Sequence, residues 1–83
     1  MEYLLYPIAT EKAVNMIERD NMITYVVDMR ATKPQIKKEF ENEFKVKVKK
    51  IGMLRSTKNF KKAFITIERT SKASDIALRL KLI

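Results

Sequence analysis

The spacing of apolar residues changes twice in the middle of the chain, and this change constrains the fold more than any other feature. "MITYVVDM" (22–29) is rich in β-branched and aromatic residues and predicts a strand, central in the sheet because both its faces are apolar. "ATKPQIKKEFENEF" (31–44) shifts to helical spacing, and "FKVKVKKIGML" (44–54) returns to alternation. The three segments predict a strand–helix–strand unit with a right-handed crossover.

The predicted helix carries its own start signal and a single apolar face. Thr32 is expected to cap its N-terminus, with Gln35 at the capping-box position. Ile36, Phe40 and Phe44 recur at every fourth position and therefore share one face, which predicts that the helix packs against the sheet.

The strand predicted over 44–54 alternates valine with lysine. Val46 and Val48 are expected to face the helices. The alternation slips at Lys49–Lys50, which predicts a β-bulge that returns Ile51 and Met53 to apolar cover. The opposite positions hold lysines: Lys45, Lys47 and Lys49.

The remaining segments complete a small α+β domain. In chain order they are a possible short edge strand over 3–6, a helix over 11–20 capped by Thr10, a strand over 62–69, and a helix over 71–80 capped by Thr70 or Ser71. The last two strands are joined directly and predict an antiparallel hairpin. The order helix, strand, helix, strand, strand, helix describes a small antiparallel sheet of three to four strands with helices mainly on one face. We expect residues 1–83 to form a single domain.

Positive charge is concentrated in one part of the chain. The net charge is +8, and residues 33–62 hold eleven basic and three acidic side chains, so this window carries the whole excess. A confined excess is typical of a surface that binds a polyanion. The residues expected to neutralise phosphates are Lys12, Lys33, Lys37, Lys38, Lys47, Lys49, Lys50, Arg55, Lys58, Lys61 and Lys62.

Other functions fit the sequence less well. The chain has no His and no Cys and lacks a Gly-rich phosphate loop, so we expect no enzyme, no metal site and no cofactor. Apolar runs fall far short of the ~20 residues that span a bilayer, and the N-terminus lacks a signal-peptide pattern, which predicts a soluble cytosolic chain. A helix with one strongly basic and one apolar face is also missing, which disfavours a membrane surface.

Several interpretations of the basic and aromatic residues stay open at this point. Lysines on a strand can simply protect a sheet edge from aggregation. A free, chromatin-like nucleic-acid-binding protein is an alternative function with the same size and charge. "KKAFITIE" lacks the glycine and the paired exposed aromatics of an RNA-recognition motif, so Phe64 is expected in the core and lysine–phosphate contact is favoured over base stacking. Phe60 either stacks on a base or folds back on the hairpin.

Three stretches resemble one protein family. "YPIATEKA" (6–13), "ATKPQIKKEFENEFKVKVKKIGML" (31–54) and "KKAFITIE" (61–68) are similar, in order and spacing, to the universal large-subunit ribosomal protein L23 family. Pro34, the short hairpin loop and the lack of an N-terminal extension resemble archaeal members. Gly52–Met53 departs from the Asn–Thr that members often carry, so an RNA contact made by that asparagine would be missing here.

The resemblance implies a fold, a location and partners. It implies an α+β domain in the large ribosomal subunit in the cytoplasm, bound to large-subunit ribosomal RNA and neighbouring ribosomal proteins beside the peptide exit tunnel. Members also offer a docking surface for signal recognition particle, translocon or nascent-chain chaperones. Glu11 occupies the place of the glutamate that docks a chaperone in bacterial members. The short loop over 55–62 is expected not to reach toward the tunnel.

Overall fold

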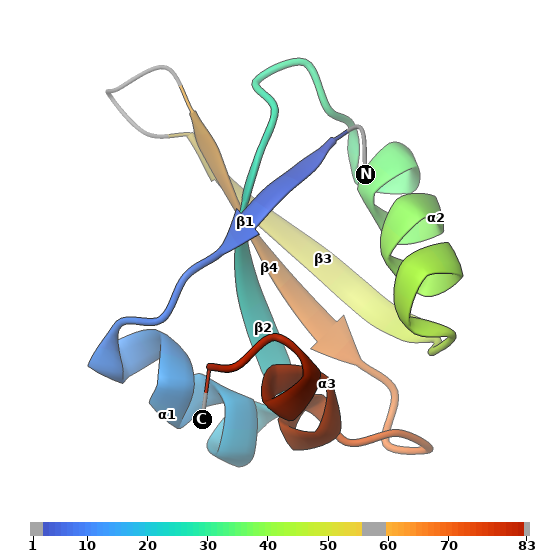
Figure 1. The fold of residues 1–83 in the computed structure, drawn as a ribbon. Coiled ribbons are helices and arrows are strands. Elements are labelled where there is room, and N and C mark those ends of the chain that lie inside the picture. Colours follow the sequence, from blue (N-terminus) through green and yellow to red (C-terminus); the bar gives the residue numbers. More distant parts are fainter. Residues whose placement is uncertain (1–2, 56–59, 83) are drawn as a thin grey trace.

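The fold is a four-stranded sheet with three helices, seen in a computed structural model that describes residues 3–55 and 60–82 (Figure 1). In chain order the elements are β1 (Leu4–Pro7), α1 (Glu11–Asp20), β2 (Met22–Val27), α2 (Lys33–Phe44), β3 (Val48–Arg55), β4 (Lys61–Ile67) and α3 (Ala73–Arg79). The predicted α+β class and the order of the six main elements are confirmed. The short edge strand expected over 3–6 is also present, as β1.

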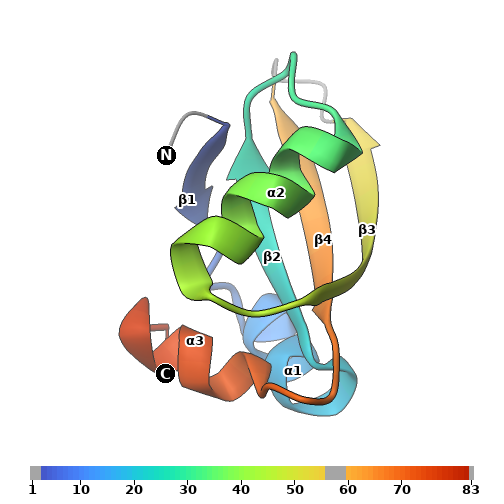
Figure 2. The same ribbon diagram turned by 90° about the vertical axis from the view of Figure 1, so that its right-hand side faces the viewer.

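The sheet has the order β1-β2-β4-β3, and every neighbouring pair of strands is antiparallel. Strands β2 and β3 therefore run parallel to each other with β4 between them, and α2 forms the crossover that joins them (Figure 2). Strand β2 has a partner on each side, and five of its six residues are buried. Its apolar composition predicted this central position, which is confirmed.

Helix α2 lies across one face of the sheet, which we call the core face (Figure 2). Its buried residues are the three that the spacing predicted: Ile36, Phe40 and Phe44. The rings of Phe40 and Phe44 are 4.6 Å apart between centroids, and Tyr25 of β2 meets Phe40 edge-on at 6.3 Å. Burial of each such side chain stabilises the fold by roughly 1.5–3 kcal/mol, so α2 and the sheet hold each other in place.

The polar side of α2 positions strand β1. The predicted capping box of Thr32 and Gln35 is present, and Gln35 Nε2 also donates to the hydroxyl of Tyr3 at 3.2 Å. One turn further on, the carboxylate of Glu39 accepts the backbone N–H groups of Tyr3 at 2.9 Å and Leu4 at 2.6 Å. These bonds satisfy the start of an edge strand that would otherwise leave its donors unpaired.

Strand β3 begins at Val48, so the prediction of a strand from residue 44 was wrong for its first residues. Lys45 has a φ of 57° and ends α2 in the left-handed conformation, which breaks the extended run that alternation suggested. Glu41 Oε2 then accepts the N–H of Val48 at 2.8 Å. The predicted bulge is confirmed by a register shift between Val48 and Lys50. The apolar residues of this stretch pack on the core as predicted: Val46, Val48, Ile51 and Met53.

Asn21 joins the end of α1 to the end of β4 and the start of α3. It ends α1 in the left-handed conformation, with a φ of 53°. Its Nδ2 donates to the carbonyls of Ile67 at 2.8 Å and Ser71 at 3.1 Å, and its Oδ1 accepts the N–H of Ala73 at 2.7 Å. One amide therefore ties together three elements that lie together at one end of the sheet (Figure 1).

The start of α3 differs from the prediction that Thr70 or Ser71 caps it. The capping position is Lys72, whose side chain makes no capping hydrogen bond. Asn21, 52 residues earlier than Ala73, supplies the acceptor instead. Local sequence suggested a nearby hydroxyl, but the tertiary fold brings a better-placed amide to the same donor.

Replacing Asn21 with Ala should lower the free energy of unfolding by roughly 2–4 kcal/mol, because it removes three hydrogen bonds of about 0.5–1.5 kcal/mol each. Urea denaturation would measure the decrease. Asn21→Gly is the matched control, since it removes the same bonds but relieves the strain of a positive φ. If the Gly variant were as stable as the wild type, the amide bonds would contribute no more than the strain that glycine relieves.

The stability of the protein should fall in alkali because of Tyr25. Burial, and then the nearby charges of Glu43 and Glu39, raise the pKa of Tyr25 above its ordinary value of 10.0. The unfolded chain loses the Tyr25 proton at a lower pH than the folded chain does. The stability that protonated Tyr25 contributes is therefore fully present below pH 10, and it declines as the pH rises toward the pKa of the folded state. Urea titrations of wild type and Tyr25→Phe at several alkaline pH values would check this. As the pH rises, the free energy of unfolding of the wild type should fall more steeply than that of Tyr25→Phe. Parallel curves of this free energy against pH would contradict the prediction.

Candidate nucleic-acid interface

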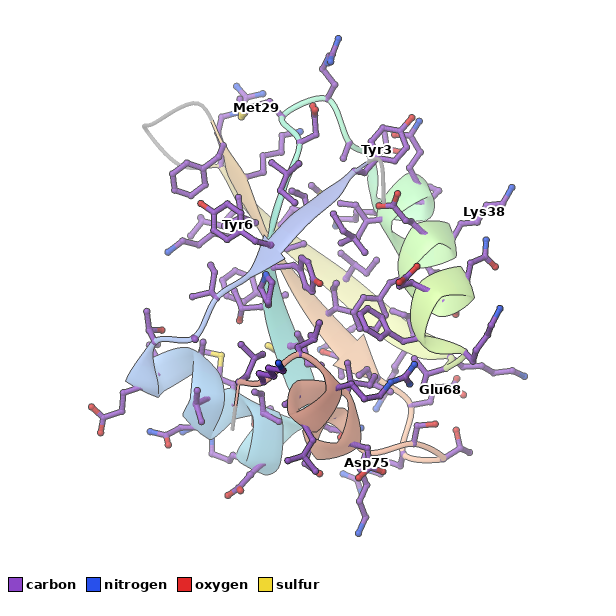
Figure 3. The ribbon with its side chains drawn as sticks, viewed as in Figure 1. Tyr3, Tyr6, Met29, Lys38, Glu68 and Asp75 are labelled. Carbon is purple, nitrogen blue, oxygen red and sulfur yellow. The ribbon has the colours of Figure 1, made fainter. Side chains whose placement is uncertain are left out.

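The predicted basic residues of α2 form the first of three groups. Lys33, Lys37 and Lys38 are all exposed, on the sides of the helix that do not face the sheet. Lys38 points outward from the body of the molecule (Figure 3). Their position follows from the helical period, because the core-facing residues occupy the opposite side.

The second group lies where the chain enters β3. Lys47, Lys49 and Lys50 are exposed there, and the bulge places Lys49 and Lys50 next to each other at the edge of the sheet. A hollow beside them is also lined by three more basic residues, Arg19, Arg69 and Lys72, and by two acids, Glu18 and Asp20. These three basic residues lie outside the charged window, so sequence reasoning missed them, and only the return of α1 and the β4–α3 connection to this corner brings them in.

The third group lies at the far end of the β3–β4 hairpin. Arg55 is exposed, and Lys61 and Lys62 are half-buried at the start of β4. Lys58 falls outside the described residues. The backbone N–H of Arg30, assisted by its guanidinium and by the charge of Lys61, holds the pKa of Asp28 below its usual value. Lys61 is thus near an acid, whereas Lys62 shares a hollow with Lys12 of α1.

The three groups do not form one compact patch. The eight residues of β3 span about 25 Å at ~3.3 Å per residue, so the second and third groups lie at opposite ends of the hairpin. With the exposed lysines of α2 they make an extended band of positive charge and not one compact site. An extended band suits a long polyanion better than a small phosphorylated ligand.

The lysines of this band keep their charge available. In the described part of the chain no lysine forms an ion pair; Arg19 pairs with Asp20 at 3.2 Å and Arg30 with Asp28 at 3.5 Å. Two of the three acids in the window instead accept backbone N–H groups: Glu39 from β1, and Glu41 from Val48. These two carboxylates are thus held by the backbone.

The sheet face opposite α2, which we call the open face, is partly uncovered. Its residues follow from the strand register: Tyr6, Met22, Thr24, Val26, Lys50, Gly52, Leu54, Lys62, Phe64 and Thr66. Tyr6 and Leu54 are 56% and 57% exposed. The expectation that Phe64 lies in the core was wrong, because its neighbours Ala63 and Ile65 take the core-facing positions and Phe64 is half-buried on the other face.

Two other residues singled out in the sequence are near the surface. Glu11 is exposed at the first position of α1, where Thr10 Oγ1 accepts the N–H of Ala13 at 3.3 Å as predicted. Glu11 is thus free to meet a partner while also stabilising the helix N-terminus. Phe60 is half-buried just before β4, a position that leaves both interpretations of its ring open.

Neither a metal-binding cluster nor a membrane-spanning helix occurs in the described residues. No group of three or more acidic side chains lies close enough there to hold a metal ion. Among the same residues, no helix has the length and apolar character needed to cross a membrane. What the described surface offers is charge, shape and a partly exposed aromatic face.

Comparison with known proteins identifies the family of the chain. The family model described as "Ribosomal protein L23" matches residues 2–80. The chain is also 42% identical over 80 residues to "Large ribosomal subunit protein uL23" of the archaeon Picrophilus torridus, an alignment that covers 96% of each chain. The chain therefore belongs to the ribosomal protein L23 family, whose members are structural proteins of the ribosome and not enzymes.

Proposed function

We propose that this chain binds large-subunit ribosomal RNA near the peptide exit tunnel and adds a docking surface for nascent-chain factors. Family membership supports a structural role in the large ribosomal subunit, in the cytoplasm, among neighbouring ribosomal proteins. The observation that carries RNA binding is the band of lysines without ion pairs in the described chain. Such lysines release counterions when they meet phosphates, and this release drives binding.

The RNA contact is assigned to the basic residues of the three groups. The lysines of α2, those at the start of β3 and those at the hairpin end each neutralise phosphates along this band. The full set is Lys12, Lys33, Lys37, Lys38, Lys47, Lys49, Lys50, Arg55, Lys58, Lys61 and Lys62. We add Arg69 and Lys72 to it, because they line the same hollow as Lys49 and Lys50.

Replacing two phosphate-binding lysines should weaken RNA binding in a salt-dependent way. For Lys49→Gln with Lys50→Gln, the slope of log K against log salt should become shallower by about 0.9 for each phosphate that is no longer neutralised, taking the duplex value for DNA. Filter binding of large-subunit ribosomal RNA across a salt series would measure this slope. Lys81→Gln, an exposed lysine beyond the window, is the control and should keep the wild-type slope.

The same assay separates the proposal from its alternative. A free, chromatin-like protein would bind duplex DNA and small-subunit RNA as tightly as large-subunit RNA. The proposed function requires a clear preference for large-subunit RNA and sedimentation with large subunits through moderate salt. Equal affinity for all three nucleic acids would refute it.

The docking role is assigned to Glu11. Glu11→Gln should leave the affinity for large-subunit RNA unchanged, because an acid does not contact phosphates. It should weaken binding of signal recognition particle to large subunits reconstituted with the variant, measured by cosedimentation. Its melting temperature should fall only slightly, since a first-turn acid contributes about 0.3–1 kcal/mol. Wild-type cosedimentation would reduce Glu11 to a helix-stabilising residue.

A further inference from the structure

The open face places one aromatic ring between two lysines. Strand register puts Gly52, Phe64 and Thr24 side by side in one row across β3, β4 and β2. Lys50 lies in the next row toward one end of the sheet, and Lys62 in the next row toward the other. Rows on one face are about 6.6 Å apart, two residues at ~3.3 Å each, so a cation lies on each side of the ring.

We propose that the open face binds an unpaired nucleotide, whose base stacks on Phe64 and whose flanking phosphates contact Lys50 and Lys62. The inference rests on the proposed function and adds a second kind of contact to it. Lysines bind phosphates wherever they lie, but an aromatic ring between them suits a splayed-out base, because every base has a π-face.

The space beside the ring is left by Gly52. This residue is paired directly with Phe64, and a Cβ added to it would meet Phe64 Cβ at 3.9 Å, which is ordinary van der Waals contact. With no side chain at Gly52, the flank of Phe64 on the β3 side has no cover from its cross-strand partner. A glycine at this place in a strand is typical of a close approach by a ligand or another backbone.

Unsatisfied polar groups lie under the same surface. The hydroxyls of Thr24 and Thr66 are buried and have no hydrogen-bond partner among the described residues. Thr24 adjoins Phe64 in its row, and Thr66 adjoins Lys50. Buried hydroxyls are normally paired, but both of these oxygens are already covered by the protein, so they mark the polar character of this face and are not themselves contacts for the nucleotide. Met16, which borders the hollows on this face, has a flexible side chain that can move aside.

The charge of the two hollows around Phe64 favours RNA over a protein partner. The hollow on the Thr24 side is lined by Lys12 and Lys62 and by no acidic residue. The hollow on the Gly52 side contains Lys50 and one acid, Asp20, which already pairs with Arg19. An apolar peptide would need none of these lysines, whereas a nucleotide uses both the ring and the charge.

Two variants test the stacking contact. Phe64→Leu removes the ring but keeps an apolar side chain, and Gly52→Val fills the space beside the ring. Each should weaken binding of large-subunit ribosomal RNA by about 5- to 150-fold, the range measured for one stacked base. The slope of log K against log salt should stay at the wild-type value, since the lysines that meet phosphates are all retained. Gly52→Ala, whose added methyl reaches only ordinary contact distance, is the matched control and should bind within about 2-fold of the wild type.

The outcomes separate this inference from the proposed function. If wild type shows no preference for large-subunit RNA, both fail. If wild type shows the preference but both variants bind like it, the proposed function stands and the stacking contact is overturned. Gly52→Val guards against a folding artefact, because a β-branched residue favours a strand and its melting temperature should equal or exceed that of the wild type.

Crosslinking identifies the occupant directly. Large subunits assembled with wild-type protein and RNA containing 4-thiouridine would be irradiated, and the β4 peptide carrying Phe64 analysed by mass spectrometry. A nucleotide attached to this peptide supports the proposal. A second sample would be treated with a protein–protein crosslinker. If a peptide of a neighbouring protein were attached to the β4 peptide, and no nucleotide were, a protein would cover the open face and the nucleotide proposal would be overturned.

Discussion

The amide of Asn21 is the interaction that holds α1 and α3 together at one end of the sheet. It ends α1, bonds to the last residue of β4 and supplies the acceptor at the start of α3. Because α1 is held at this corner, Met16 and Lys12 border the open face, and Arg19 lies beside Lys49 and Lys50. A single polar side chain thus connects the packing of one end of the sheet to the surface that we assign to RNA.

The two faces of the sheet differ in how they are covered. The core face is closed by α2, and the Glu39 and Glu41 side chains of that helix satisfy backbone donors of β1 and β3. The open face has no comparable cover and carries a ring, two lysines and two unpaired hydroxyls among the residues that the structure describes. Helix α1 borders only part of this face, and Tyr6 and Leu54 at its rim stay more than half exposed.

Much of the fold follows from local pattern because the core residues of α2 and β2 have unambiguous periods. The capping box at Thr32 and the bulge at Lys49–Lys50 were also predictable, since each depends on residues a few positions apart. The start of β3 was not, because alternation of valine and lysine over 44–48 looks the same whether the backbone is extended or turns at Lys45. The cap of α3 comes from across the fold, and no local pattern reveals it.

The sequence by itself determined the fold class, the core of α2 and the window that carries the excess charge, because periodicity and composition act at short range. Only the tertiary structure decided which basic side chains lie near one another. It brought Arg69 and Lys72 to the corner of Lys49 and Lys50, and separated that corner from the hairpin end. It also put Phe64 on the open face, because the register with β2 and β3 gives the core-facing positions to Ala63 and Ile65. A side chain's face in a strand of mixed residues depends on its partners, and those partners lie far away in the chain.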